Sequence, residues 1–218
     1  MAAIPRDHPL THDHPLTHDH PLAHDHAASL GQPTVYLVRH GATAANLQHP
    51  PRLQGRRSDP PLAEPGYQQA DAASAQLAAV PLVAVYSSPL RRARETAERI
   101  ARPHRLRVEV CEALIECDVG QWEGLDRQTI DRLDPLAHRR FLADPAQHGY
   151  PGGESFAQVQ ARLRAWRAAV LPRHAGQAIA VVSHHVVLRI WLAELAGLPL
   201  SQARQMTLAN GEVRRVSG

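Results

Sequence analysis

The sequence predicts an α/β protein in which a mostly parallel central sheet lies between two layers of helices. Three short apolar segments, residues 35–38, 83–86 and 178–182, have the length and composition of buried strands. Each is followed by a stretch with helical periodicity, and strands that alternate with helices are typical of a parallel sheet covered on both faces. We therefore expect a three-layer α/β/α sandwich.

The first half of the chain continues this alternation. A loop rich in Pro, Gly and Arg is expected over residues 50–65, followed by an alanine-rich helix over 66–80. The strand near residues 82–86 precedes a helix over about 90–102, and residues 107–110 predict another short strand.

The second half adds further helices and one more strand. Residues 126–142 predict one or two helices interrupted at Pro135, in a candidate inserted subdomain. A later amphipathic helix ends at Pro172, and a helix over 186–196 follows the third strand. Residues 213–216 predict a terminal edge strand. The apolar face of the amphipathic helix consists of Phe156, Val159, Leu163, Trp166 and Val170.

Length and composition indicate one domain over residues 31–218. The chain has 218 residues, 44% of them hydrophobic, which is enough for one sizeable core. No apolar run approaches the ~20 residues that span a bilayer, and the first thirty residues lack the apolar segment of a secretion signal. We therefore expect a cytoplasmic protein. Cys111 and Cys117 are too few for a disulfide framework and are expected to be free thiols.

All 24 basic residues are arginines, and they are unevenly distributed. Residues 1–26 hold one arginine and four aspartates, so the rest of the chain, with 23 basic and 17 acidic residues, carries a net charge of +6. Aromatic residues make up only 4%, and the arginines are scattered among acidic residues, which argues against nucleic-acid binding. Arginine does suit a phosphate site, because its guanidinium group matches phosphate oxygens.

A tandem repeat occupies the N-terminus. The unit Asp-His-Pro-Leu-Thr-His begins at Asp7 and recurs, with small changes, to His26. With a proline and few apolar groups in each unit, residues 1–30 are expected to form a disordered His-rich tail. Its seven histidines could chelate a divalent metal, and a repeat expansion without a selected role is the alternative.

Charged and histidine side chains follow three of the predicted strands. Arg39, His40 and Gly41 follow the first strand, Arg91 comes shortly after the second, and His184 follows the third. Ligands of open α/β sheets bind in the crevice beyond the carboxyl ends of the strands. An arginine there can hold phosphate and a histidine can act as nucleophile, so the pattern predicts phosphoryl chemistry. A packed or solvated histidine is the alternative for any one of these positions.

Six segments, in order, resemble the histidine phosphatase or phosphoglycerate mutase-like superfamily. The resemblance extends over residues 34–210 and implies the phosphoglycerate mutase-like fold. Its segments are Arg-His-Gly-x-Thr-x-x-Asn at 39–46, Leu-Gln-Gly at 53–55 with the loop to Gly66, Ser-Ser-Pro-Leu-Arg-Arg-Ala at 87–93, the acid segment at 114–124, Gly-Glu-Ser at 153–155 and Val-Ser-His at 182–184.

The resemblance implies the roles of five residues. His40 is expected to attack phosphorus and form a phosphohistidine, which water then hydrolyses. Arg39 and Arg91 are expected to hold the phosphate, with His184 as a further donor. Glu116 matches the general acid of the family. Its rivals Glu112 and Glu123 are expected to be surface or structural residues.

The same resemblance indicates residues that bind substrate, and the chain departs from the pattern at two positions. Position 42 is alanine where the family often has a glutamate or glutamine, and His185 stands where glycine is usual. Either change could alter substrate choice. The expected substrate-binding residues are Thr43, Asn46, Gln54, Gly55 and His185.

A phosphatase that acts on small phosphorylated metabolites is the favoured function. The segment between the acid and the late helix, residues 124–153, is shorter than is usual in cofactor-dependent mutases. Because arginines supply the positive charge, we expect no metal and no cofactor. The alternatives are a phosphoglycerate mutase and a non-catalytic protein that binds a phospho-ligand or metal. We expect neither nucleic-acid nor membrane partners, and the chain could be a monomer or a homodimer.

Overall fold

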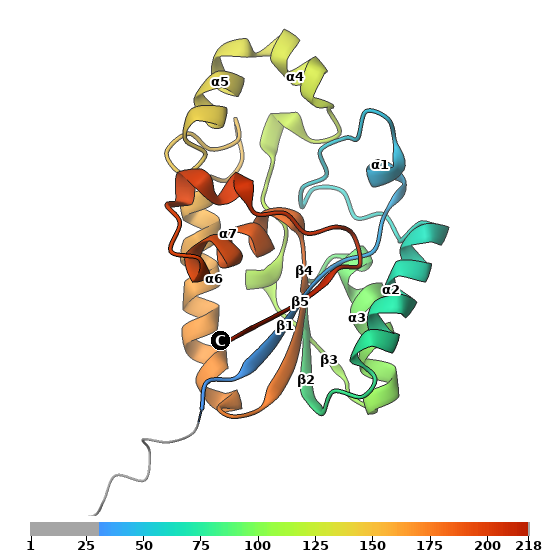
Figure 1. Ribbon diagram of the computed structural model, residues 1–218. Coiled ribbons are helices and arrows are strands. Elements are labelled where there is room, and N and C mark those ends of the chain that lie inside the picture. The colour runs from blue at the N-terminus through green and yellow to red at the C-terminus, as the bar shows by residue number, and fades with distance from the viewer. Residues whose placement is uncertain (1–30, 218) are drawn as a thin grey trace, which may run out of the picture. The chain divides into compact units, whose positions relative to one another are not determined.

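The computed structural model describes residues 31–217, and a mixed five-stranded sheet forms its centre (Figure 1). The strand order is β3-β2-β4-β1-β5, with all neighbouring pairs parallel except β1 and β5. The predicted tail over residues 1–30 lies outside the described residues. The strands are β1 (Thr34–Arg39), β2 (Leu82–Ser87), β3 (Val108–Val110), β4 (Ala178–Ser183) and β5 (Val213–Ser217).

Helices cover both faces of this sheet, which confirms the predicted α/β sandwich. In Figure 1, α2 (Glu64–Leu77) and α3 (Arg91–His104) cover one face, and α6 (Phe156–Val170) and α7 (His185–Leu195) cover the other. Beyond the carboxyl ends of the strands lie α4 (Arg127–Leu133) and α5 (Pro135–Ala143), at the top of Figure 1. The remaining short elements are α1 (Ala44–Leu47) and the 3₁₀-helices η1 (Glu112–Leu114), η2 (Gly120–Trp122), η3 (Leu171–His174) and η4 (Leu200–Gln205).

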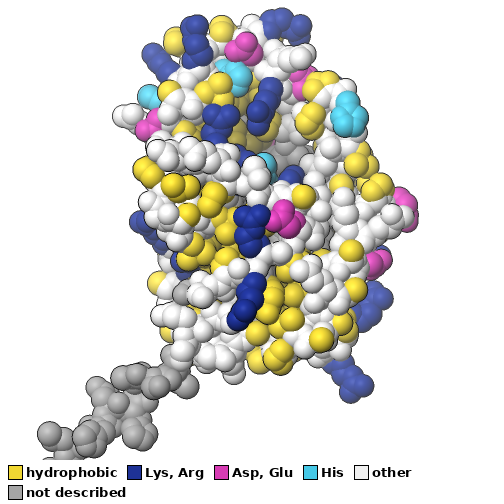
Figure 2. Space-filling view, in the orientation of Figure 1, with side chains coloured by type: hydrophobic (Ala, Val, Ile, Leu, Met, Phe, Trp, Pro, Cys, Tyr) yellow, Lys and Arg dark blue, Asp and Glu magenta, His cyan; other side chains and the backbone are white. Residues whose placement is uncertain are grey.

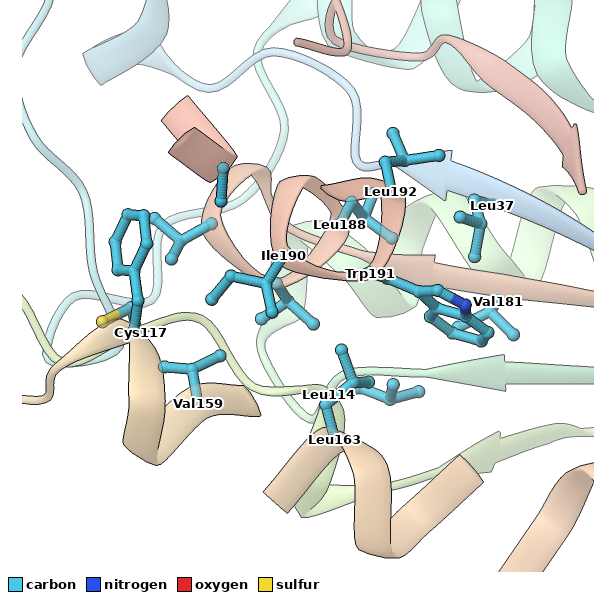
Figure 3. Packing of buried hydrophobic residues seen from close by; sticks show 14 of the residues in the cluster. Leu37, Leu114, Cys117, Val159, Leu163, Val181, Leu188, Ile190, Trp191 and Leu192 are labelled. Atoms are coloured by element: carbon cyan, nitrogen blue, oxygen red, sulfur yellow. The ribbon is translucent and has the colours of Figure 1, made fainter. Parts of the chain in front are cut away.

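Side chains along each strand point alternately to the two faces of the sheet, and an apolar core forms on each face. Leu37 and Val181 point to the face covered by α6 and α7, where they pack with Trp191 (Figure 3). The next residues in each strand, Val38 and Val182, point to the opposite face, under α2 and α3. Because successive side chains of a strand point to opposite faces, a sheet buried on both sides needs apolar residues at every position.

Helix boundaries follow the expected capping signals. Ser155 caps α6 through a reciprocal capping box with Gln158, and the helix ends just before Pro172. Asp134 caps α5 and separates it from α4, so the predicted interruption at Pro135 is confirmed. Cys111 and Cys117 are free thiols, as predicted. Over residues 31–217, the helices are too short or too polar to span a membrane.

Close contact between α2 and the loop after β1 leaves no room for a side chain at Gly66. A Cβ at this position would lie 2.0 Å from the carbonyl oxygen of Ala42, and a Cβ at Gly41 would lie 2.2 Å from the carbonyl oxygen of Gly66. The backbone N–H of Ala42 also donates to Oε1 of Gln69 at 2.8 Å. These contacts hold the loop that contains His40 against α2.

We expect Gly66→Ala to lower the free energy of unfolding by about 1–3 kcal/mol, the usual cost of forcing atoms into a packed interior. Urea denaturation measures this change. Ala72→Ser, an exposed substitution in the same helix, should cost about 0.5 kcal/mol or less. Equal stability of the two variants would contradict the close packing at Gly66.

Candidate active site

The register of β1 and β4 brings two histidines together at the carboxyl edge of the sheet. Arg39 pairs with Ser183, so His40 and His184 are the next residues on neighbouring parallel strands. Their ring centroids are 5.0 Å apart. Both side chains are buried, with 4% and 0% of their surface exposed. The predicted pair therefore shares one site.

His40 presents a neutral nitrogen. Its Nδ1 lies 2.7 Å from the carbonyl oxygen of Gly41, which can only accept, so Nδ1 carries the proton and Nε2 keeps a free lone pair. Burial lowers the pKa of His40 well below its ordinary 6.5, and the positive charges of Arg92 and Arg39 lower it further. The imidazole is consequently neutral near pH 7, and its Nε2 is able to act as a nucleophile.

The structure contradicts the prediction that Arg91 holds the phosphate. Arg91 is exposed, and its Nε donates to Oε1 of Glu95 at 2.7 Å, one helical turn away. The next residue, Arg92, is fully buried and is the strongest charge that acts on both His40 and His184. Arg92 rather than Arg91 is the second arginine of the site.

The carbonyl oxygens of two loop residues hold Arg92. Its Nη2 donates to Gly55 at 2.8 Å and its Nη1 to Ser58 at 2.9 Å. Within residues 31–217 its Nε has no hydrogen-bond partner. Burial lowers the pKa of Arg92, and the negative charge of Glu116 partly opposes this effect. The guanidinium group therefore lacks a close counter-ion of its own.

Arg39, which is half-buried, is the other cation of the site. Its Nη1 donates to the carbonyl oxygen of Leu208 at 2.8 Å. Burial lowers its pKa to about 10, so the side chain remains charged at neutral pH. Among the ion pairs of residues 31–217, none includes Arg39 or Arg92. Two guanidinium groups without carboxylate partners among the described residues suit a bound anion.

His184 is positioned as a hydrogen-bond donor by Ser88. The backbone N–H of Leu90 donates to Oγ of Ser88 at 3.2 Å, so the hydroxyl proton is free to point at Nε2 of His184, 2.7 Å away. That arrangement leaves the proton of the neutral ring on Nδ1, which has no partner among the described residues. Burial also lowers the pKa of His184 well below 6.5.

Glu116 lines the same cavity as His40 and is a carboxyl group with a raised pKa. The side chain is 4% exposed, and burial raises its pKa above the ordinary 4.5. Its Oε1 accepts from the backbone N–H of Cys117 at 2.8 Å. The rivals are placed elsewhere: Glu112 is exposed, and Glu123 accepts hydrogen bonds from the backbone N–H of Gly55 and the hydroxyl of Ser58.

A cavity of about 510 Å³ lies at this site, and the fully buried Arg92 and His184 are not among the residues of its wall. Figure 2 shows a hollow in the upper part of the molecule with arginine side chains around it. Arg39, His40 and Glu116 line the cavity, and so do three of the predicted substrate-binding residues, Asn46, Gln54 and His185. The other residues of its wall are Pro50, Pro51, Arg52, Leu53, Val119, Arg127, Gln128, Tyr150, Val186 and Asn210.

Thr43 and Gly55, both predicted to bind substrate, lie behind this wall. The hydroxyl of Thr43 lies 2.9 Å from Oε1 of Gln54, and its backbone N–H donates to Oδ1 of Asn46 at 3.0 Å. The side-chain oxygens of Gln54 and Asn46 thus already accept hydrogen bonds. The side-chain nitrogen of each amide remains to donate to a ligand. The carbonyl of Gly55 instead holds Arg92.

The two departures from the family pattern have different surroundings. The side chain of Ala42 is 2% exposed, packs beside α2 and is not part of the cavity wall. His185 does line the cavity, and its Nε2 lies 2.5 Å from Nη2 of Arg189. Burial and the charge of Arg189 lower the pKa of His185 to about 2, so the neutral ring accepts this hydrogen bond.

Comparison with known proteins agrees with the geometry. The model of the histidine phosphatase superfamily (branch 1) matches residues 35–218. The chain belongs to the histidine phosphatase superfamily. The resemblance inferred from the six sequence segments is thereby confirmed.

Several members of the superfamily are similar over most of this chain. A bifunctional protein of Mycobacterium tuberculosis is 40% identical over 164 residues, which are 74% of this chain and 44% of that protein, so the chain spans less than half of that relative. Phosphoserine phosphatase 1 of Hydrogenobacter thermophilus is 36% identical over 76% of this chain and 77% of its own length. Probable phosphoglycerate mutase GpmB of Salmonella choleraesuis is 34% identical over 84% and 83%.

A solved structure supports the same fold. Mycobacterial glucosyl-3-phosphoglycerate phosphatase superposes with a TM-score of 0.72 and 30% sequence identity, covering 85% of this chain and 90% of the other. Phosphatases are thus among both the sequence relatives and the structural neighbours of this chain.

Several residues that contact or line this site could not be identified from the sequence motifs. Asn210 marks only the end of the segment that resembles the superfamily, yet its Nδ2 donates to the carbonyl oxygen of His40 at 3.0 Å. It lies in the segment before β5 and carries no local pattern that marks a ligand. For Arg92 a signal existed, because helical spacing puts it on the same face as the buried Thr96 and Ile100. The cavity residues Arg127 and Tyr150 gave no such signal.

Proposed function

We propose that this chain is a phosphomonoesterase that hydrolyses small phosphorylated metabolites through a phosphohistidine on His40. The observation that carries the proposal is a neutral histidine beside two arginines, the half-buried Arg39 and the fully buried Arg92, neither of which forms an ion pair within residues 31–217. A phosphate monoester is a dianion, so it needs fixed cations and an uncharged nucleophile.

In the first step, the lone pair of Nε2 of His40 attacks phosphorus in line with the leaving oxygen. The P–N bond forms as the P–O bond to the alcohol breaks, and Glu116 gives its proton to the leaving oxygen. Arg39, Arg92 and the Nδ1–H of His184 hold the equatorial oxygens. The raised pKa of Glu116 supports this role, because a buried carboxyl group keeps its proton more readily.

In the second step, water attacks the phosphohistidine. The carboxylate of Glu116 takes a proton from the water as the new P–O bond forms and the P–N bond breaks. Inorganic phosphate leaves, and both His40 and Glu116 return to their first state. The two arginines supply the charge that stabilises both transition states, so we propose that the reaction needs no metal and no cofactor.

Measuring phosphate release from a panel of phosphate monoesters tests this activity. We expect saturable release by the purified protein with at least several alkyl and aryl phosphates. Absence of release from every substrate at catalytic protein concentrations would favour the alternative of a non-catalytic phospho-ligand protein.

Phosphoglycerate mutase activity is the alternative within the superfamily, and one relative carries that name. The names of phosphoserine phosphatase 1 and glucosyl-3-phosphoglycerate phosphatase support hydrolysis instead. Incubation with 3-phosphoglycerate distinguishes the two, because a hydrolase releases phosphate without forming the 2-isomer. Isomer exchange faster than phosphate release would overturn the hydrolase proposal.

Glu116→Gln is expected to slow hydrolysis of an alkyl phosphate such as glycerol 3-phosphate by about 10²-fold or more in kcat, because an alkoxide leaves poorly without a proton. The loss should be smaller with p-nitrophenyl phosphate, since nitrophenolate leaves without one. Glu112→Gln, an exposed substitution nearby in the chain, is the control. Equal losses on the two substrates would contradict the general-acid role.

The pH dependence provides a second measurement. Activity toward an alkyl phosphate should fall as pH rises through the raised pKa of Glu116, because the proton donor is lost. Glu116→Gln should lack this alkaline limb. Protonation of His40 should abolish activity only well below pH 6.5, since its pKa is lowered.

A cytoplasmic location and the lack of nucleic-acid or membrane partners stay predictions.

A further inference from the structure

A small recess adjoins the cavity on the side of α4, α5 and α7. Its volume is about 80 Å³. The recess and the cavity have five wall residues in common, so a ligand in the cavity can reach into the recess. The shared residues are Leu53, Arg127, Tyr150, His185 and Val186.

Three arginines from different parts of the chain line this recess. Arg127 is the first residue of α4, Arg189 lies on α7 and Arg204 lies in η4. Arg189 is 8% exposed, Arg204 is half-buried and Arg127 is exposed. We call this set the arginine cluster.

The arginine cluster has no acidic counter-ion. No aspartate or glutamate lines the recess, and none of the three arginines forms an ion pair within residues 31–217. Their hydrogen bonds go to neutral groups: Arg204 Nη1 donates to the carbonyl oxygen of Leu142 at 3.3 Å, and Arg189 Nη2 donates to His185. The buried Nε of Arg189 has no partner among the described residues.

Some arginines elsewhere in residues 31–217 do have carboxylate partners. Arg57 pairs with Asp118, Arg91 with Glu95, and Arg167 with Glu194. In the cluster, by contrast, burial lowers the pKa of Arg189 and Arg204, and the positive charge of Arg127 lowers both further. The negative charge of Glu116, which lines the neighbouring cavity, opposes this effect only at Arg189. Cations that repel one another in a recess beside the reacting group are stabilised by an anionic ligand.

We propose that the substrate carries a second anionic group, the size of a carboxylate, which binds to the arginine cluster while the phosphate lies at His40. This inference rests on the proposed phosphatase activity and specifies its substrate class. A cavity volume of about 10–15 Å³ in this measure holds one water molecule, so a recess of about 80 Å³ has room for a small group such as a carboxylate. The apolar walls made by Trp122, Ile130 and Phe141 limit the space further.

The test compares three substrates. 3-Phosphoglycerate and glycerol 3-phosphate differ in one carboxylate, and p-nitrophenyl phosphate reports phosphatase activity without a second anionic group. We expect kcat/KM to be about tenfold or more higher for 3-phosphoglycerate than for glycerol 3-phosphate, the effect of one charge-assisted contact. The difference should appear mainly in KM and shrink as salt is added.

Arg127→Gln is the first variant, because this exposed side chain forms no hydrogen bond within residues 31–217 and its loss should not impair folding. We expect it to reduce the preference for 3-phosphoglycerate over glycerol 3-phosphate about fivefold or more. Arg204→Gln should reduce this preference too. Because Arg204 also donates to the carbonyl oxygen of Leu142, thermal unfolding of the variant is measured to check that it is folded. Arg140→Gln, an exposed substitution in α5, is the matched control and should keep the preference.

The outcomes separate this inference from the proposed function. Hydrolysis of p-nitrophenyl phosphate with no preference for 3-phosphoglycerate would overturn the role of the arginine cluster and leave the phosphatase intact. A preference that survives in both Arg127→Gln and Arg204→Gln would overturn it too. If none of the three substrates releases phosphate, the proposed function itself is wrong.

Discussion

Replacing His40 by alanine is expected to reduce phosphate release by about 10⁴-fold or more, because the first step then loses its nucleophile. His40 is held by its Nδ1 contact to Gly41, and alanine removes that contact together with the nucleophile. Steady-state phosphate release from p-nitrophenyl phosphate measures the loss. Protein denatured in alkali during turnover should also carry acid-labile phosphate in the wild type and none in His40→Ala.

A histidine far from the site provides the control. His104 lies at the carboxyl end of α3, at the opposite end of the helix from Arg92, and His104→Ala should keep both turnover and the labelled intermediate. Substantial turnover in a correctly folded His40→Ala variant would mean that water attacks phosphorus directly. The phosphohistidine mechanism would then be wrong.

The second large effect is expected at Arg92. Arg92→Gln should lower kcat/KM by about 10²–10³-fold, the usual cost of removing one fixed donor to a developing oxyanion. Arg91→Gln is a matched control from the adjacent position, because its side chain is exposed and paired with Glu95. This variant should stay within about twofold of the wild type.

Inhibition by inorganic phosphate provides an independent measurement of the same contrast. The affinity for phosphate can be measured from its competitive inhibition of p-nitrophenyl phosphate hydrolysis. This affinity should fall strongly in Arg92→Gln and hardly at all in Arg91→Gln. The opposite result would restore Arg91 as the phosphate ligand. A circular dichroism spectrum checks that Arg92→Gln keeps its fold, since the buried side chain also holds the carbonyls of Gly55 and Ser58.

The fold was predictable because short stretches of the sequence indicate their own secondary structure. Apolar segments of strand length lead into helices with clear caps, and these features alone place β1, β2, β4 and the helices that follow them. Most of the site residues at the strand ends were predictable for the same reason. His40 and His184 each come directly after a buried strand, and parallel strands bring their carboxyl ends to one edge.

The error at Arg91 arose where a strand motif passes into a helix. Successive helical residues point about 100° apart, so of two adjacent arginines only one can face the sheet. Two local signals favoured Arg92: Glu95 lies one turn after Arg91, as in an exposed ion pair, and Thr96 lies one turn after Arg92 on the buried face. The motif alone does not show which of the two arginines faces the sheet, because it ignores the direction of each side chain around the helix.

The arginine cluster could not be predicted from the sequence. Arg127, Arg189 and Arg204 lie in separate elements, and each has neighbours of ordinary composition. Only the packing of α4, α7 and η4 around one recess brings them together. The chain is rich in arginine throughout, so no single arginine stood out.

The contact between Asn210 and the carbonyl of His40 has a consequence for biosynthesis. The loop that carries the nucleophile is completed by a residue about 170 positions further along the chain. During synthesis, His40 leaves the ribosome long before Asn210 does, so its loop cannot gain this hydrogen bond until most of the described chain has been made. We expect the loop to reach its final form only when β5, the strand after Asn210, pairs with β1.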